Sequence, residues 1–107
     1  MAFSYLVGLE VADAARYDEY RRAMRPSLVK YEGDFGCDFG VDRVLFSPED
    51  APINRVFKIR FPSRERANAF FGDRDYRAVK ERYSDAAVAA TTILGAYEDA
   101  DGSDLSQ

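Results

Sequence analysis

The stretch FSYLVGLEV at residues 3–11 places an apolar side chain at every second position, which is the pattern of a strand with one buried face. The stretch INRVFKIRF at residues 53–61 ends in the same alternation. If the two strands run antiparallel with Phe3 opposite Phe61, their apolar residues share one face of a sheet. We therefore predict that these strands are neighbours at the centre of the fold.

A helix is predicted between these two strands. Asp13 suits its N-cap, and Gly33 suits its end. Its apolar stripe, at steps of three and four residues, comprises Tyr17, Tyr20, Met24, Leu28 and Tyr31. Pro26 lacks a backbone donor and clashes with the preceding turn, so we expect either a kink near Arg22 or two helical pieces.

The other elements complete the predicted order of the fold. Residues 34–47 alternate again, with glycines that indicate a bulge or bend, and a turn-rich loop follows them. A second helix begins at Ser63, is broken and recapped at Gly72 and Asp73, and precedes a strand over 91–97. This order is typical of the ferredoxin-like fold, a βαββαβ antiparallel sheet with two helices on one face.

Length and charge bound the possible partners of the protein. The 107 residues suffice for one hydrophobic core, so we predict a single domain over 1–98 and an acidic, flexible tail over 99–107. The net charge is −4, and the acidic excess lies in the tail, which disfavours binding to nucleic acids and anionic membranes. No apolar stretch is long enough to span a bilayer and the first residues lack a leader pattern, so we expect a cytoplasmic protein.

The lack of histidine excludes several classes of site. With no histidine and one cysteine, the chain cannot form a Ser-His-Asp triad, an internal disulfide or a zinc site of His and Cys ligands. Cys37 has no basic partner in the pattern around it, so we interpret it as a strand residue rather than a nucleophile. We expect neither a metal ion nor an organic cofactor.

The face of the sheet away from the helices mixes apolar and charged residues. It would carry Ser4, Leu6, Gly8, Val56, Lys58 and Arg60. This face is too apolar to be fully solvated, and a second copy packed sheet to sheet would cover it. We therefore predict a homodimer.

Four segments carry the pattern of a known family. They are YLVGLEV at residues 5–11, YDEYR at 17–21, YEGDF at 31–35 and FPSRERANAF at 61–70. Together with Tyr76, Lys80 and Arg82 they resemble the bacterial family called domain of unknown function 1330, over residues 4–98. The resemblance implies the dimeric α/β-barrel superfamily, in which a ferredoxin-like subunit pairs its sheet with a second copy. Relatives on that fold include cofactor-free monooxygenases, lactone isomerases, haem-degrading enzymes and ligand-sensing domains, and the fold does not choose among them.

Tyrosines and arginines are the candidate ligand-binding residues on the helices. Tyr17 and Tyr20 lie on the predicted stripe, where their hydroxyls could hold a polar ligand or where the rings are simply part of the core. Arg82 matches an arginine of the family pattern. It could hold a carboxylate or enolate, or else complement the C-terminal end of its helix.

Lys58 and Arg60 are the candidates on the sheet. They could attract an anionic small molecule into a partly closed barrel. The alternative is that they form ion pairs across the dimer interface, with Glu10 or Asp38 as partners.

Two functions fit these residues. The first is a small-molecule-binding protein or cofactor-free enzyme, oxygenase- or isomerase-like, that binds a small anionic or phenolic ligand between the helices and the sheet. The second is a non-catalytic dimerisation module, in which the same aromatic residues fill the interior and leave no pocket. Haem degradation would need an axial iron ligand other than histidine.

Overall fold

Alternating apolar residues produce the centre of the sheet. In the computed structural model, which describes residues 2–99, β1 (Ala2–Val11) pairs antiparallel with β3 (Arg55–Phe61). Phe3 lies opposite Phe61, which confirms the predicted register. The strand order of the sheet is β2-β3-β1-β4, and each neighbouring pair is antiparallel.

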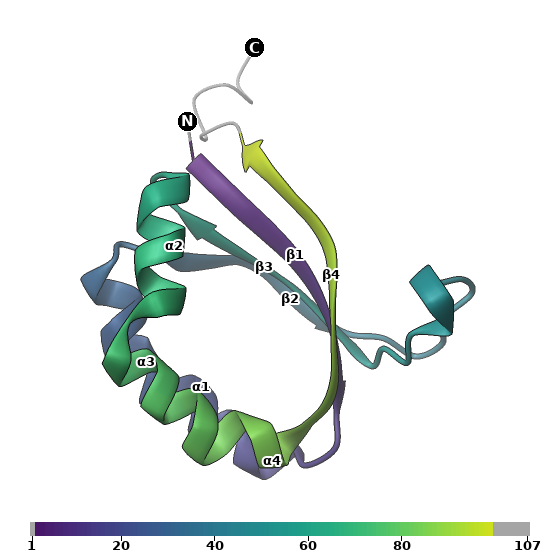
Figure 1. Cartoon of the computed structure of the whole chain (residues 1–107). Helices are drawn as coiled ribbons and strands as arrows, with labels where there is room; N and C mark the ends of the chain where they lie inside the picture. Colours follow the sequence, from purple (N-terminus) through teal and green to yellow (C-terminus); the bar gives the residue numbers. More distant parts are fainter. Residues whose placement is uncertain (1, 100–107) are drawn as a thin grey trace.

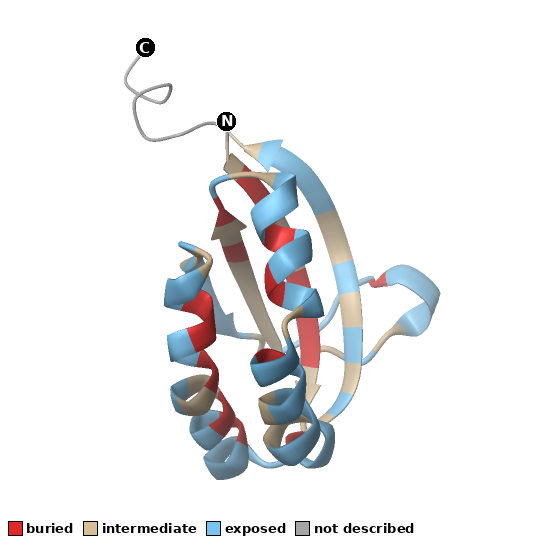
Figure 2. Ribbon diagram, turned by 60° about the vertical axis from the view of Figure 1, so that its left-hand side comes forward, coloured by how far each residue is buried: buried red, intermediate tan, exposed pale blue. Residues whose placement is uncertain are grey.

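The helices cover one face of a curved sheet (Figure 1; Figure 2). The remaining elements are α1 (Ala14–Lys30), β2 (Asp34–Gly40), α2 (Arg64–Gly72), α3 (Arg74–Val79), α4 (Asp85–Ala87) and β4 (Val88–Asp99), with a 3-10 turn at Pro48–Asp50 and a π-helical turn at Lys80–Ser84. This is the predicted ferredoxin-like fold. None of the helices among residues 2–99 has the length and apolar character needed to cross a membrane.

α1 begins where predicted, because the side chain of Asp13 accepts a hydrogen bond from the backbone N of Arg16 at 3.0 Å. The helix continues through Pro26, so the predicted alternative of two helical pieces is wrong. Met24 and Leu28 are buried on either side of the proline. This burial outweighs the loss of one backbone hydrogen bond.

Gly33 is required by close packing rather than by its backbone torsion. The positive φ after α1, 61°, belongs to Glu32. A Cβ at Gly33 would lie 2.5 Å from Cδ1 of Leu28 and 2.7 Å from Cε1 of Phe61. The chain therefore leaves α1 through a gap between a helix residue and a strand residue, where only a hydrogen fits.

β2 contains the bulge that its glycines predict. Its register with β3 shifts between Phe35 and Cys37, on either side of Gly36. Because a bulge inserts one extra residue, it exchanges the two faces of the strand beyond it. Asp38 therefore faces the helices, as Phe35 does, and Phe39 faces away from them with 54% of its surface exposed.

Two strand boundaries differ from the prediction. β2 ends at Gly40 rather than near residue 47, because β3 begins only at Arg55 and leaves the intervening residues without a facing strand. Leu45 and Phe46 lie instead in a projecting loop, where they are 83% and 92% exposed. β4 is longer than predicted, since it pairs along the whole of β1.

The second helical region is broken where predicted. Ser63 caps α2 by accepting from the backbone N of Arg66, and Asp73 caps α3 by accepting from that of Tyr76. The core lies between these helices, α1 and the sheet, and its completely buried aromatic residues include Phe61 and Phe70.

The predicted tail begins within the last strand. Asp99 is the final residue of β4 and lies opposite Ala2. The rest of the predicted tail, residues 100–107, lies outside the described residues.

Candidate functional site

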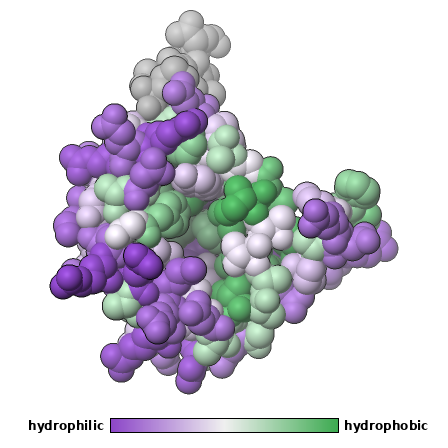
Figure 3. All heavy atoms as spheres, viewed as in Figure 1, coloured by the Kyte–Doolittle hydropathy of each residue, from purple (hydrophilic) through white to green (hydrophobic). Residues whose placement is uncertain are grey.

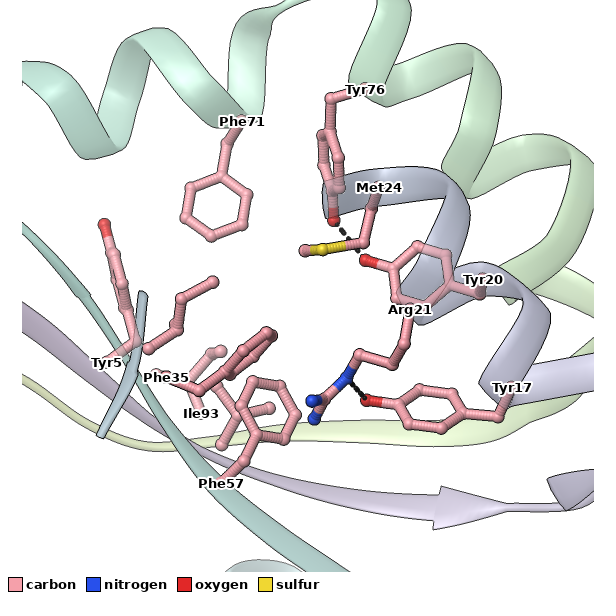
Figure 4. Close-up of a pocket in the computed structure, with 12 residues that line it drawn as sticks. Tyr5, Tyr17, Tyr20, Arg21, Met24, Phe35, Phe57, Phe71, Tyr76 and Ile93 are labelled. Atoms are coloured by element: carbon pink, nitrogen blue, oxygen red, sulfur yellow. Dashed lines mark hydrogen bonds between the residues drawn. The ribbon is translucent and has the colours of Figure 1, made fainter. Parts of the chain in front are cut away.

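A cavity of about 250 Å³ lies between the helices and the sheet. It is visible as a hollow bordered by apolar side chains in the space-filling view (Figure 3). Much of its wall is aromatic: β1 contributes Tyr5, β2 contributes Phe35, β3 contributes Phe57 and α2 contributes Phe71 (Figure 4). Since an engineered apolar cavity of about 150 Å³ binds benzene, this cavity has room for a benzene ring that carries substituents.

Arg21, on α1, brings a positive charge into this wall (Figure 4). Its Nε donates to the hydroxyl of Tyr17 at 2.8 Å, and its Nη1 lies 3.2 Å from Oδ2 of Asp38. Its guanidinium carbon lies 3.9 Å from the ring centroid of Phe35 and 4.8 Å from that of Phe57. Its Nη2 is buried and has no hydrogen-bond partner among the described residues. The wall therefore contains a charged donor whose hydrogen-bonding capacity is not satisfied among the described residues.

A second arginine fixes Asp38. Arg55 donates from Nε to Oδ1 at 2.9 Å and from Nη2 to Oδ2 at 2.7 Å, which is the bidentate geometry of a strong ion pair. The hydrogen bonds from Arg55 hold the pKa of Asp38 below its usual range. Two guanidinium groups share one carboxylate, so the cluster of Arg21, Arg55 and Asp38 carries one net positive charge.

Tyr20 and Tyr76 form a buried phenol pair whose oxygens are 2.8 Å apart (Figure 4). Burial raises the pKa of both hydroxyls, so both keep their protons at neutral pH. One proton forms the hydrogen bond between the two oxygens, and the other is available to an acceptor. The pair is therefore a neutral donor in the cavity wall.

Asp73 holds Tyr76 in place. Its carboxylate accepts from the backbone N of Tyr76 at 3.0 Å, from the hydroxyl of Tyr31 at 2.6 Å and from Nζ of Lys30 at 3.1 Å. The hydrogen bond from Tyr31, with these others, keeps the pKa of Asp73 well below its usual range. Asp73 thus joins the end of α1 to the start of α3, and it fixes the two helices that carry the phenol pair.

Two of the predicted site residues line the cavity. Tyr17 and Tyr20, from the stripe of α1, both do so. Arg82 does not line it: this residue is exposed in the π-helical turn, with its guanidinium carbon 5.3 Å from the ring centroid of Tyr83. Ligand binding by Arg82 stays a prediction.

The two sheet candidates lie on the opposite face of the sheet from the cavity. Lys58 and Arg60 both form ion pairs with Asp99, which also accepts a hydrogen bond from Ser4 at 3.0 Å. The predicted ion pairs of Lys58 and Arg60 across a dimer interface, with Glu10 or Asp38, stay a prediction. Anion binding by Lys58 and Arg60 stays a prediction.

The sequence patterns did not reveal the charged cluster. Arg21 follows Tyr17 by four residues, which places both on one side of α1 and is the signal that could have identified it. The bulge in β2 turns Asp38 to the face of the sheet that carries the helices. The sequence does not say at which residue the bulge lies, so it does not say which residues beyond the bulge face the helices.

The sequence pattern of one protein family, described as "Domain of unknown function (DUF1330)", matches residues 4–97. No curated protein matches the chain.

Solved structures with the same fold are known from several bacteria. A protein of unknown function from Rhodopseudomonas palustris matches with a TM-score of 0.76 and 18% identity, over 94% of this chain and 83% of that one. A DABB family protein with a ferredoxin-like fold from Mesorhizobium loti matches with a TM-score of 0.61 and 12% identity, over 94% and 98%. A dimeric ferredoxin-like protein of unknown function from Thermobifida fusca matches with a TM-score of 0.59 and 12% identity, over 92% of each chain.

Proposed function

Because the chain belongs to the DUF1330 family, whose description names no reaction, we propose its function from the cavity itself: it binds a small anionic or phenolic molecule between the helices and the sheet. The observation that carries this proposal is Nη2 of Arg21, a buried cationic donor without a hydrogen-bond partner among residues 2–99. An unsatisfied charged donor is costly in an apolar wall, and the oxygen of a bound anion removes that cost.

The same site suits a cofactor-free, oxygenase- or isomerase-like reaction on an enolate or phenolate. Arg21 and the phenol protons would stabilise negative charge on a substrate oxygen, and the aromatic wall would exclude water. Asp38 is a poor general base, because two arginines hold its charged form. The substrates that fit are therefore compounds acidic enough to enter the cavity already ionised.

A dimerisation module with a filled interior is the second candidate function. The cavity of about 250 Å³ argues against it, since a purely structural core is packed without voids of this size.

The proposal is tested by calorimetric titration with benzoate, a ring-bearing anion. Arg21→Met keeps the length of the side chain and removes the charged donor, and we expect it to weaken binding at least about tenfold. Arg22→Met is the matched control, because Arg22 is the next residue of α1 and is exposed. Arg82→Met is a separate arm: if it abolishes binding and Arg21→Met does not, the site lies elsewhere and the proposal is wrong.

We also propose that two copies pair through the outer face of the sheet. Phe39 and Tyr97 are partly exposed on this face, and the projecting loop adds Leu45 and Phe46. Exposed apolar groups of this kind are typical of an interaction surface. The Thermobifida fusca neighbour is described as dimeric, which supports pairing of two copies.

Light scattering tests the pairing. We expect a mass twice the 12.1 kDa of one chain. Phe46→Asp should lower the mass toward one chain. Val29→Asp is the matched control, because Val29 is an exposed apolar residue of α1 on the helical side of the molecule. A wild-type protein that stays monomeric at high concentration would contradict the pairing.

A further inference from the structure

We infer, on the premise of the proposed function, that the ligand is a ring-bearing monoanion with a second, uncharged oxygen acceptor. Its anionic oxygen binds Nη2 of Arg21, and its neutral acceptor binds the phenol pair of Tyr20 and Tyr76. Its ring lies against the aromatic wall that borders both groups (Figure 4).

The charge of the ligand follows from the charges at Arg21. Within ion-pair distance, Arg21 and Arg55 share the single carboxylate of Asp38, and Asp18 acts only on Arg55 and from farther away, so Arg21 has no carboxylate of its own. Among the residues of 2–99 that line the cavity, Arg21 alone is charged. One negative charge on the ligand completes the pairing, whereas a second would be buried without a partner and would oppose binding.

Tyr17 adds a second hydrogen-bond donor at the place where the anionic oxygen of the ligand would bind. Its hydroxyl accepts from Nε of Arg21, and burial raises its pKa, so the hydroxyl keeps its own proton. Tyr17 is 1% exposed, which leaves little access for water. The oxygen that binds Nη2 therefore has a phenol donor next to the guanidinium group, a combination that favours a carboxylate or enolate oxygen.

The neutral acceptor follows from the protons of the phenol pair. Tyr20 and Tyr76 together hold two hydroxyl protons, of which their mutual hydrogen bond uses one. The side chains are 8% and 5% exposed, so water reaches the second proton poorly. Either oxygen can be the donor in the pair, so the free proton can be presented by either tyrosine. A carbonyl oxygen of the ligand satisfies it without adding charge.

The acceptor is tested with two probes of nearly the same shape. Para-acetylbenzoate carries a carbonyl oxygen, and para-isopropenylbenzoate carries a CH2 group in its place; the meta isomers repeat the comparison at a second spacing. We expect the wild-type protein to bind the acetyl compound about fivefold more tightly than the isopropenyl compound for at least one isomer, the gain of one neutral hydrogen bond. Equal affinities for both isomers would overturn the inference.

Variants of the phenol pair locate the donor. Each of Tyr20→Phe and Tyr76→Phe leaves one phenol that can donate to the ligand, so the preference for the acetyl compound should persist in both. The double variant has no phenol left here and should bind both probes equally, while it still binds benzoate. A preference that survives in a folded double variant would overturn the assignment to this pair.

The outcomes separate this inference from the proposed function. If the wild-type protein binds benzoate through Arg21 but gains nothing from the acetyl group, the function stands and the inference fails. If neither benzoate nor either probe binds, the proposed function itself fails. Circular dichroism melts of each variant establish that the comparison is made between folded proteins.

Discussion

Two carboxylates of the sheet each hold two cationic side chains, and they lie on opposite faces. Asp38 faces the helices, where it holds Arg21 and Arg55. Asp99 lies on the outer face, where it holds Lys58 and Arg60. The two carboxylate side chains are similarly exposed, at 25% and 18%. Burial therefore does not distinguish the two clusters.

The surroundings of the cations distinguish them. Arg21 stacks on aromatic rings, and two of its nitrogens have fixed partners, so its remaining nitrogen is held in place without a hydrogen-bond partner among the described residues. Lys58 carries its charge on a flexible stem, and its nitrogen lies 5.7 Å from the ring centroid of Tyr97. A planar, stacked guanidinium recognises an anion with a defined geometry, which an ammonium group does not. For this reason we place the proposed binding site at the inner cluster.

The largest difference between the packed core and the outer face of the sheet should be the cost in stability of adding a methyl group to a glycine. At Gly33 a Cβ would meet Leu28 and Phe61 of the packed core, so we expect Gly33→Ala to lower the free energy of unfolding by about 2–3 kcal/mol. At Gly8, on the outer face, a Cβ would meet Cδ1 of Ile53 at 2.7 Å, which is the far end of a half-buried side chain outside the core. Gly8→Ala should cost less than about 1 kcal/mol. Urea denaturation measures both, and equal losses would contradict the contrast.

Removal of each carboxylate charge should have a smaller effect. Asp38→Asn leaves two arginines close together without their shared partner, and we expect a loss of about 1–2 kcal/mol in the free energy of unfolding. Asp99→Asn affects a cluster in which one cation is a lysine on a flexible stem that can move away into solvent, so its loss should stay within about 1 kcal/mol. A larger loss for Asp99→Asn would reverse our ranking of the two clusters.

The pH dependence should show the smallest effect. The hydrogen bonds from Arg55 lower the pKa of Asp38 in the folded protein relative to about 3.9 in the unfolded chain. The stability that this carboxylate contributes is thus present above pH 4, and it is lost as the pH falls through the lowered folded pKa. The difference between the wild-type protein and Asp38→Asn should shrink from pH 5 toward pH 2. A constant difference in urea denaturation would show that the charge of Asp38 is not its source.

The central register and the helix caps were predictable because they depend on local patterns. Period-two alternation sets Phe3 opposite Phe61, and the N-caps at Asp13 and Asp73 precede helical periodicity. The projecting loop between β2 and β3 was not predictable, because residues 44–46 are as apolar as a strand but have no strand opposite them. Whether a segment becomes a strand depends on the partner that the fold supplies.

The site was predictable only in its tyrosines. Tyr17 and Tyr20 lie on a helical stripe, which periodicity identifies. Arg21 is next to that stripe, and arginine is a residue type that usually faces solvent. Its inward orientation depends on the ion pair with Asp38. The orientation of Asp38 depends in turn on the bulge in β2, a feature of pairing between strands that are distant in sequence.

A crystal structure of the complex with para-bromobenzoate tests the central claim most directly, because the anomalous signal of bromine locates the ring without ambiguity. We predict bromine density inside the cavity, with the carboxylate within hydrogen-bond distance of Nη2 of Arg21. Bromine bound instead at Lys58 and Arg60 on the outer face, or a cavity that stays empty at saturating ligand, would contradict the account.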